Sequence, residues 1–372
     1  MTWTDQTKLH LKKYGYLIFF LLALLPVFAH GFNRFFGHND AFAWAGPVIV
    51  FGVIPVLDWL LGPDPTNPNE SDVTPMSAER YYMLLTLACV PMVFGVLAFG
   101  GWVFATWPLG WLGKIGWLFS CGIVGGALGI TVAHELVHKD SRLEKWAGGL
   151  LLSFVCYGGF KIEHVRGHHV NVSTPADASS SRYNQSLYEF LPQAYVRNFL
   201  NAWRLEAKEM QRHGRSLLPW HNELLWWYGL SAIWCALTTW AWGLAGFVYF
   251  VGMSFSAFTL LEIVNYIEHY GLHRRQLENG RYERITHEHS WNSNYLLTNL
   301  FLFHLQRHSD HHAHAKRRYQ VLRHFPDSPQ LPAGYATMVV LALIPPLWFK
   351  IMNPRVDAYY ADDLLDLNVG LA

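Results

Sequence analysis

Six long apolar stretches shape the chain and alternate with polar, charged segments; they cover about 15–32, 42–61, 81–104, 115–133, 223–241 and 245–267. Each approaches or exceeds the roughly 20 residues that an α-helix needs to cross about 30 Å of hydrocarbon. The pattern predicts an all-α, polytopic membrane protein with six transmembrane helices. A shorter apolar stretch, Trp146 to Phe160, cannot cross comfortably, and we expect a re-entrant or buried helix there.

The segment 187–213 has an amphipathic pattern. Its apolar side chains recur at helical spacing on the side opposite several basic ones, which predicts a helix lying in the membrane interface. An ordinary amphipathic helix of a cytoplasmic cap is an equal alternative. The apolar set is Val196, Phe199, Leu200, Trp203 and Met210, and the basic set is Arg197, Arg204, Lys208 and Arg212.

Pro345 and Pro346 interrupt the last apolar stretch, 335–352, which we therefore expect to lie along the surface rather than to cross. No small-residue cleavage site follows the first apolar stretch, which indicates a retained anchor and not a removed signal peptide. Without an internal repeat, residues 1–372 are predicted to form a single membrane-embedded domain.

The basic residues predict the orientation of the helices. Of 28 Lys and Arg residues, 26 fall on one side of the predicted membrane, and only Arg34 and Lys114 fall on the other. Because basic residues accumulate on the cytoplasmic side, both termini and the segments after the fourth and sixth stretches are expected to face the cytoplasm.

The composition supports a membrane protein, since 52% of the residues are hydrophobic and only 15% are charged, against roughly 25% charged in a soluble domain. A net charge of +1 gives no reason to expect a nucleic-acid partner. The four cysteines lie in apolar segments without a Cys-x-x-Cys spacing, which argues against disulfides and against a cysteine-held iron site in this chain.

Nine of the 20 histidines fall into four short motifs beside the apolar stretches. The motifs are His-Glu-Leu-Val-His at 134–138, Glu-His-Val-Arg-Gly-His-His at 163–169, Asn-Tyr-Ile-Glu-His at 265–269 and Gln-Arg-His-Ser-Asp-His-His at 306–312. Imidazole is the commonest metal ligand, and one ion has no room for nine of them. The motifs therefore predict two metal ions at the membrane surface, with His304 and His314 outside the ligand set.

Helix geometry predicts how the histidines pair. Residues four apart share a helical face, so the pairs 134/138, 164/168 and 308/312 can each direct two nitrogens toward one region. Adjacent residues diverge by about 100°, so the members of 168/169 and of 311/312 suit different ions.

The first motif also fits His-Glu-x-x-His, the helix of zinc metalloproteases in which the glutamate is the general base. Such a protease needs one further protein ligand and leaves the other clustered histidines without a role. Bound zinc rather than iron would favour this alternative.

Together the motifs resemble the eight-histidine signature of the integral-membrane desaturase and hydroxylase superfamily, and specifically the bacterial membrane alkane 1-monooxygenases. The narrower likeness rests on Asn-Tyr-Ile-Glu-His-Tyr-Gly at 265–271, an element that desaturases lack, and on Leu-Gln-Arg-His-Ser-Asp-His-His at 305–312. The segments 291–294 and 55–58 fit as well, so the resemblance covers most of 10–355.

The resemblance implies a non-haem diiron centre in the bacterial cytoplasmic (inner) membrane. Its two iron ions would be held by His134, His138, His164, His168, His169, His269, His308, His311 and His312. It further implies hydroxylation of medium-chain n-alkanes to 1-alkanols with O2, using electrons from a rubredoxin that a rubredoxin reductase reduces. The alternative within the superfamily is a fatty-acyl desaturase or hydroxylase.

Nine neutral imidazoles would not neutralise the charge of two ferrous ions, which is about four positive charges near hydrocarbon. Burying this charge is unfavourable, and carboxylates next to the ligands should offset it. Asn265 shares a helical face with His269 and could orient it. For Asp140 and Glu163 the capping of a helix end is an equal alternative. The proposed supporting residues are Glu135, Asp140, Glu163, Glu262, Asn265, Glu268 and Asp310.

Glycines in the fourth stretch precede His134, and close helix packing is the favoured explanation for them. They could instead leave room for an alkyl chain beside the helix, together with side chains of the second stretch. The candidate channel residues are Val50, Phe51, Ile54, Gly122, Gly126 and Gly129.

The chain has no flavin or nucleotide fingerprint, so a separate carrier must bring electrons. An acidic rubredoxin is expected to dock on the basic residues around the motifs. These are Lys139, Arg142, Lys145, Arg166, Arg307, Lys316, Arg317 and Arg318.

Overall fold

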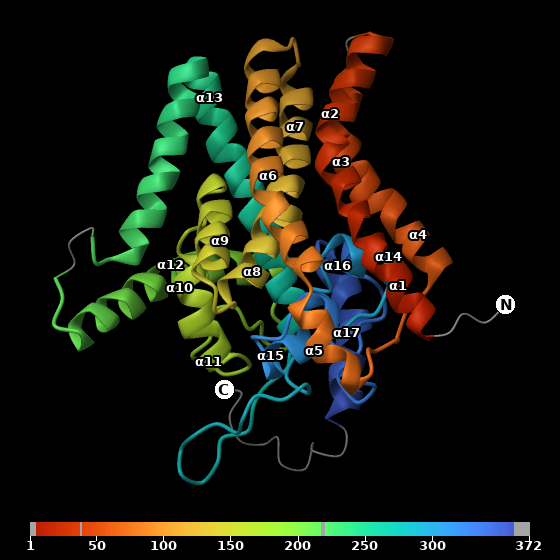
Figure 1. Ribbon diagram of the computed structural model, residues 1–372, viewed down its shortest axis with the longest axis vertical. Helices are drawn as coiled ribbons and strands as arrows, with labels where there is room; N and C mark the ends of the chain where they lie inside the picture. The colour runs from red at the N-terminus through yellow and green to blue at the C-terminus, as the bar shows by residue number, and fades with distance from the viewer. Residues whose placement is uncertain (1–4, 38, 217–219, 361–372) are drawn as a thin grey trace.

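The computed structural model describes residues 5–37, 39–216 and 220–360. Over these ranges the regular structure is helical, and β pairing is confined to isolated bridges. The prediction of an all-α membrane protein is confirmed. Long helices fill the upper half of the molecule, and shorter helices and loops fill the lower half (Figure 1).

Five helical segments of the described residues are long and apolar enough to cross a membrane. The first, Thr7–Phe36, contains most of α1 (Asp5–Gly15) and all of α2 (Phe19–Phe36), and the second, Asp40–Leu61, contains α3 (Ala45–Val48) and α4 (Ile54–Leu61). The third is α6 (Arg80–Thr106), and the fourth, Trp111–Val137, contains α7 (Trp111–Val124) and α8 (Thr131–Val137). The fifth is α13 (Glu223–His269).

The 47 residues of α13 contain both of the last two predicted stretches. Gly243 interrupts the helix with φ 62° and ψ −146°, a conformation that glycine adopts without steric cost. The chain reverses at the top of Figure 1, so that α13 has two limbs. The limbs pack closely, because a Cβ atom at Gly246 would overlap the carbonyl of Thr238. The six-helix count of the sequence stays a prediction.

The first part of the stretch 146–160 is helical and partly buried, which agrees with the expected buried helix, but the helix ends at Phe154. It belongs to α9 (Arg142–Phe154), in which Leu151 and Leu152 are fully buried. The helix ends before Cys156, which has a φ of 53°, and the chain continues into α10 (Phe160–Glu163) and α11 (His169–Asn171).

The amphipathic segment is helical from Leu187 to Arg212 (α12), and Ser186 begins it with a capping box to Glu189. Its buried face includes Phe190 and Ala194, whereas the apolar side chain of Val196 is 59% exposed. Exposed apolar side chains on a polar helix suit the interface prediction, which remains a prediction.

The expectation for 335–352 was partly wrong. Pro345 does separate two helices, α16 (Tyr335–Ala342) and α17 (Pro345–Tyr359). These helices do not simply lie on the surface, because Met338 and Trp348 are fully buried, and Trp348 packs against the aromatic rings at the end of α13. Apolar side chains on one face of each helix explain this anchoring.

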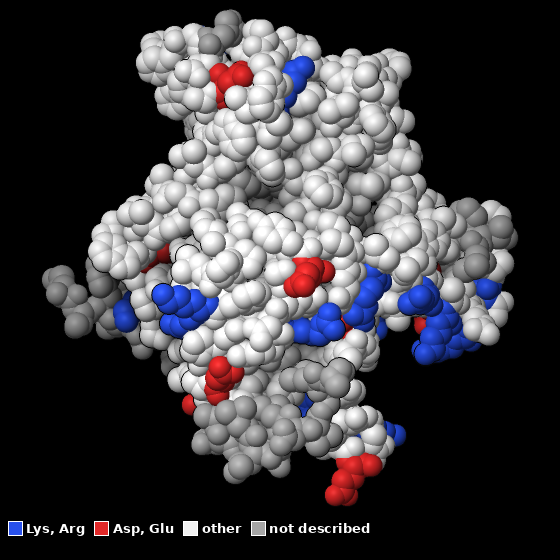
Figure 2. Space-filling model, turned by 180° about the vertical axis from the view of Figure 1, so that it is seen from behind, with Lys and Arg blue, Asp and Glu red and all other residues white. Residues whose placement is uncertain are grey.

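Three more short helices complete the lower half: α5 (Glu70–Ala78), α14 (Leu296–Phe301) and α15 (His308–Ala313). On the face seen in Figure 2, Lys and Arg side chains lie across this half together with some Asp and Glu side chains, and the band above them is nearly uncharged. This division suits helices that cross hydrocarbon above a water-facing region.

Candidate metal centre

The nine histidines of the four motifs gather into two buried groups. Within each group the nearest ligand nitrogens all lie within 4.8 Å of one another. One group has five members, His134, His138, His164, His169 and His311, and the other has four, His168, His269, His308 and His312. The adjacent pairs 168/169 and 311/312 divide between the groups, as their angular separation on a helix predicts.

One pairing differs from helical spacing. His164 groups with His169, five residues later, rather than with His168. The backbone of His164–His168 forms a wide helical turn with hydrogen bonds to the fifth residue, which brings residues five apart onto one side. The wide turn was not visible in the sequence, and it corrects the expected 164/168 pair. The pairs 134/138 and 308/312 follow the four-residue rule.

The ring nitrogens converge in the way that a cation requires. The Nε2 atom of His169 lies 3.1 Å from that of His164 and 3.1 Å from that of His311. In the other group, the Nε2 atom of His312 lies 2.9 Å from that of His308 and 3.2 Å from that of His168. A metal–nitrogen distance of about 2.1 Å at right angles gives neighbouring ligand nitrogens about 3.0 Å apart. The Nε2 atoms of His134 and His138 are buried without a hydrogen-bond partner. The residues present therefore fit metal ions.

Burial keeps these rings neutral. Loss of solvent lowers the pKa of His138, His164, His169, His308, His311 and His312 well below the usual value for histidine. Since only a neutral imidazole has a lone pair for a metal, these six rings can bind ions at neutral pH.

Asp177, which sequence reasoning missed, supports the second group. Its Oδ2 atom lies 2.9 Å from Nδ1 of His168, and it also accepts a hydrogen bond from Ser180. A carboxylate on the far nitrogen fixes the ring orientation and leaves Nε2 for the metal. Asp177 lies in an irregular loop, where helical spacing gives no guide. In the sequence it stands out only as a single acidic residue nine positions after the ligand His168.

Glu268 is the predicted carboxylate that touches a ligand. Its Oε2 atom lies 3.1 Å from Nε2 of His308, the nitrogen that faces the rest of the second group. Its Oε1 atom accepts a hydrogen bond of 2.7 Å from Tyr335. Glu268 is fully buried, and it therefore brings negative charge next to the four-histidine group.

Glu262 and Asn265 lie close to the centre but bond to other groups. The carboxylate of Glu262 accepts hydrogen bonds from Tyr157, Asn198 and Asn265. The side-chain amide of Asn265 donates to Glu262, so the expected orienting bond to His269 is not formed. Ser290, which was not predicted, lies 3.4 Å from Nδ1 of His269 instead.

The other predicted carboxylates pair with cations rather than with the histidines. Glu135 binds Lys139 at 2.8 Å, and Asp310 binds Arg317 at 2.6 Å. Asp140 is exposed and pairs with Lys316, so the idea that it supports the metals is corrected.

Glu135 also accepts a hydrogen bond from the backbone N–H of Tyr319, so the glutamate of the His-Glu-x-x-His string is engaged on two sides. Glu163 is buried, and burial raises the pKa of its carboxyl well above the usual range. A carboxyl that is held neutral offsets little of the charge of a metal ion.

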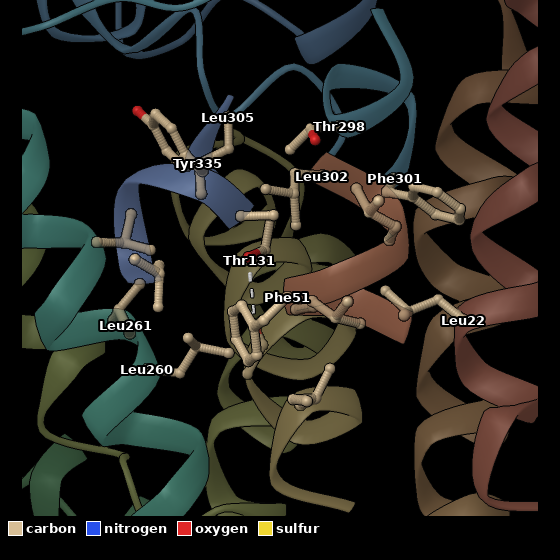
Figure 3. A pocket seen from close by; sticks show the side chains of 18 residues that line it. Leu22, Phe51, Thr131, Leu260, Leu261, Thr298, Phe301, Leu302, Leu305 and Tyr335 are labelled. Atoms are coloured by element: carbon tan, nitrogen blue, oxygen red, sulfur yellow. Dashed lines mark hydrogen bonds between the residues drawn. The ribbon is translucent and has the colours of Figure 1, made fainter. Parts of the chain in front are cut away.

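The structure contains an apolar cavity of about 60 Å³ (Figure 3). Val50, Phe51, Ile54 and Gly126 line it, as the sequence suggested. The other two candidate glycines are not among its lining residues: a Cβ at Gly122 would overlap Ser256, and one at Gly129 would lie 3.8 Å from Val93.

Two residues of the cavity lining are close in sequence to histidines of the metal groups. Thr131 lies one helical turn before His134, and Leu305 lies three residues before His308. Tyr335 stands at the edge of the cavity with its hydroxyl turned away from it, toward Glu268 (Figure 3).

Comparison with known proteins shows the family of the chain. Residues 109–342 match the family model described as fatty acid desaturase. The chain is 60% identical to Alkane 1-monooxygenase 2 of Pseudomonas aeruginosa, over 95% of each chain. It is 59% identical to Alkane 1-monooxygenase 2 of Alcanivorax borkumensis, over 96% of this chain and 94% of that protein. It is 57% identical to Alkane 1-monooxygenase 1 of Pseudomonas aeruginosa, over 98% of this chain and 96% of that protein.

Fold, histidine groups and family model define a multi-pass membrane oxidoreductase of the fatty acid desaturase family. Within it, the chain belongs to the alkane 1-monooxygenases.

Proposed function

We propose that the chain converts medium-chain n-alkanes to 1-alkanols at two iron ions held by the nine histidines. In the balanced reaction, R–CH3, O2, two electrons and two protons give R–CH2OH and water. The observation that carries the proposal is the convergence of the histidine nitrogens into two groups. The cavity with an apolar lining includes Thr131 and Leu305, which lie three residues before His134 and His308. The alkane monooxygenase relatives support the substrate class.

The five-histidine group would hold one ion and the four-histidine group, with Glu268 beside it, the other. Iron bound there would supply the binding and reduction of dioxygen. Imidazole alone does not select iron over zinc or copper, so the choice of iron rests on the family.

The protein's own contribution is rigid support in a dry site. Asp177 holds the ring of His168 through Nδ1, and Glu268 is held in turn by Tyr335. All of these side chains are buried, so water is excluded from the reacting region. Dry surroundings strengthen the electrostatic interactions and protect reactive species from side reactions.

Substrate orientation must come from shape, because an alkane offers no polar handle. Phe51, Leu260 and Leu305 line the cavity (Figure 3), and Leu305 lies three residues before His308 in the sequence. A linear chain that enters along Phe51 would present its terminal methyl group first. This arrangement favours hydroxylation at C1 over internal positions.

Electrons are proposed to come from rubredoxin, kept reduced by a rubredoxin reductase, on the cytoplasmic side of the bacterial inner membrane. The chain contains neither a nucleotide fingerprint nor a cysteine cluster that could take electrons from NAD(P)H. Of the eight basic residues expected to receive the carrier, Lys139 and Arg307 are buried.

Four more of the eight are already ion-paired: Arg166 with Glu206, Lys316 with Asp140, Arg317 with Asp310 and Arg318 with Glu144. We therefore narrow the proposed docking surface to Arg142 and Lys145, at the start of α9.

The test is product analysis with purified, iron-loaded protein, rubredoxin and its reductase, supplied with n-alkanes, fatty acids and alkylbenzenes. The proposal expects 1-alkanols as main products and about two irons per chain. Ala336→Phe, which fills the cavity, should abolish alkanol formation and retain iron, whereas Ala358→Phe on the exposed side of α17 should change neither. Desaturated fatty acids without alkanols, or one zinc per chain, would overturn the proposal.

A further inference from the structure

A second apolar cavity, of about 270 Å³, lies between α6, α9 and the two limbs of α13. Its walls include Phe94, Phe154, Trp234, Trp242 and Tyr249. It is separate from the cavity around Phe51, because the residues that line the two cavities are different.

Three polar groups of the lining, those of Tyr249, Trp234 and Thr238, have partners within the protein. The hydroxyl of Tyr249 donates to the carbonyl of Leu97 at 2.8 Å, and the indole N–H of Trp234 donates to Ser153 at 3.1 Å. A cavity of about 150 Å³ with an apolar lining stays dry and binds apolar molecules. The cavity between α6 and α13 therefore suits hydrocarbon rather than water.

Most of the cavity walls come from α6 and α13, which are candidate membrane spans, so we infer that the cavity borders the surrounding hydrocarbon. Trp240 at its edge is 86% exposed, and Trp102 and Trp111 are exposed nearby in the sequence of the adjoining helices. Exposed tryptophans gather where a bilayer meets water. The far end of the helix bundle thus lies at the level of lipid head groups.

A cation stands above the cavity at that level. Lys114 places its Nζ atom 5.3 Å from the ring centre of Phe104, and that ring lies 5.7 Å from Tyr249 in the cavity wall. Asp40 is an acidic residue at the same end of the helix bundle as Lys114. Its carboxylate accepts hydrogen bonds from the backbone N–H groups of Gly110 and Gly113. Its carboxylate is thus already engaged.

Spacing along α6 fits a lipid. The wall residues Ala98 and Phe94 precede Phe104 by six and ten residues, or about 9 and 15 Å of helix. A phosphate at Lys114 would therefore leave an acyl chain descending to the cavity. An alkane would use the cavity but not the cation.

We propose that this cavity holds one acyl chain of an anionic phospholipid whose phosphate binds Lys114. Phosphatidylglycerol carries no cation of its own to neutralise its phosphate, so Lys114 should favour it over zwitterionic phosphatidylcholine. The inference is independent of the proposed reaction.

The test uses the full, iron-loaded chain in detergent, with native mass spectrometry to count bound lipid. One phosphatidylglycerol per chain should persist at concentrations where phosphatidylcholine dissociates. Lys114→Ala should weaken the binding of phosphatidylglycerol about five-fold. Arg34→Ala, which removes the other cation of that end, is the matched control and should bind like the unchanged protein. Equal weakening by both variants would overturn the role of Lys114.

The chain's tryptophans give a second readout. Phosphatidylglycerol brominated on its acyl chain should quench the fluorescence of the cavity tryptophans, and Ala98→Phe or Ala241→Phe, which fill the cavity from different helices, should remove that quenching. Two variants are used in case one of them misfolds, and thermal unfolding shows whether each variant is folded. Inorganic phosphate should not compete with the lipid. If one molecule of dodecane displaced one molecule of lipid, the cavity would be a binding site for alkanes, and the proposal would be overturned.

Discussion

His168 and His169 follow one another in the chain, yet their Nε2 atoms point into different groups. That of His168 lies 3.2 Å from His312, and that of His169 lies 3.1 Å from His311. His311 and His312 are also neighbours in the chain. Each of the two adjacent pairs, 168/169 and 311/312, therefore contributes one histidine to each group. The two proposed ions are thus held by the same pair of short helices, α11 and α15, and by the turn before α11.

This division predicts selective metal loss. His168→Ala and His169→Ala should each lower bound iron to roughly half, since each removes a ligand from one group only. Metal analysis of purified protein measures the loss, and His213→Ala, an exposed histidine, is the control. Full iron occupancy in both variants would contradict the ligand assignment.

Asp177 should matter although it binds no metal. Asp177→Asn preserves its shape and removes the charge that holds His168, and it should weaken iron binding about 10- to 100-fold. Ser180→Ala removes one hydrogen bond to the same carboxylate and should have a much smaller effect. Competition with a chelator gives both affinities. If the two variants behave alike, the charge of Asp177 is unimportant.

The glycines before His134 should respond differently to a methyl group. Gly122→Ala would overlap Ser256 and approach the backbone of Ala257 to 3.3 Å, which should cost about 1–3 kcal/mol of stability. Gly129→Ala meets only Val93, at 3.8 Å, and should be neutral or slightly stabilising because alanine favours helix. Thermal unfolding in detergent compares them. A stable Gly122→Ala protein would contradict the close packing.

The two limbs of α13 can be tested as separate crossings. Reporters inserted at Gly243 and near Asn39 should lie on the same side of the membrane, and a reporter after Arg215 should lie on the other, because 26 of 28 basic residues fall on that side. Accessibility labelling of intact cells distinguishes the sides. A cytoplasmic Gly243 would mean that α13 does not cross twice.

Carrier docking at the start of α9 predicts a kinetic effect. Reversing Arg142 and Lys145 to glutamate should raise KM for rubredoxin several-fold and leave iron content intact, because complementary charge mainly speeds encounter. High salt should reduce the difference from the unchanged protein. Arg215→Glu, on an exposed residue beyond α12, is the control. Unchanged KM would remove these residues from the docking surface.

The sequence by itself determined the membrane class and brought nine histidines to attention. Apolar length and ligand type are local properties, and each can be recognised along the chain without knowing its neighbours. Helical spacing also predicted that 168/169 and 311/312 would divide between two groups, and the structure places them so.

Only the tertiary structure decided which distant groups meet. The wide turn at 164–168 depends on backbone hydrogen bonds that no side-chain pattern reveals, and it moved His164 to the group of His169. Asp177 reaches His168 from an irregular loop, while Asp140 is drawn to Lys316, which lies 176 residues away. In the case of Asp177 and His168, a buried polar group must find a partner in space. In both cases the path of the chain sets which partner is near.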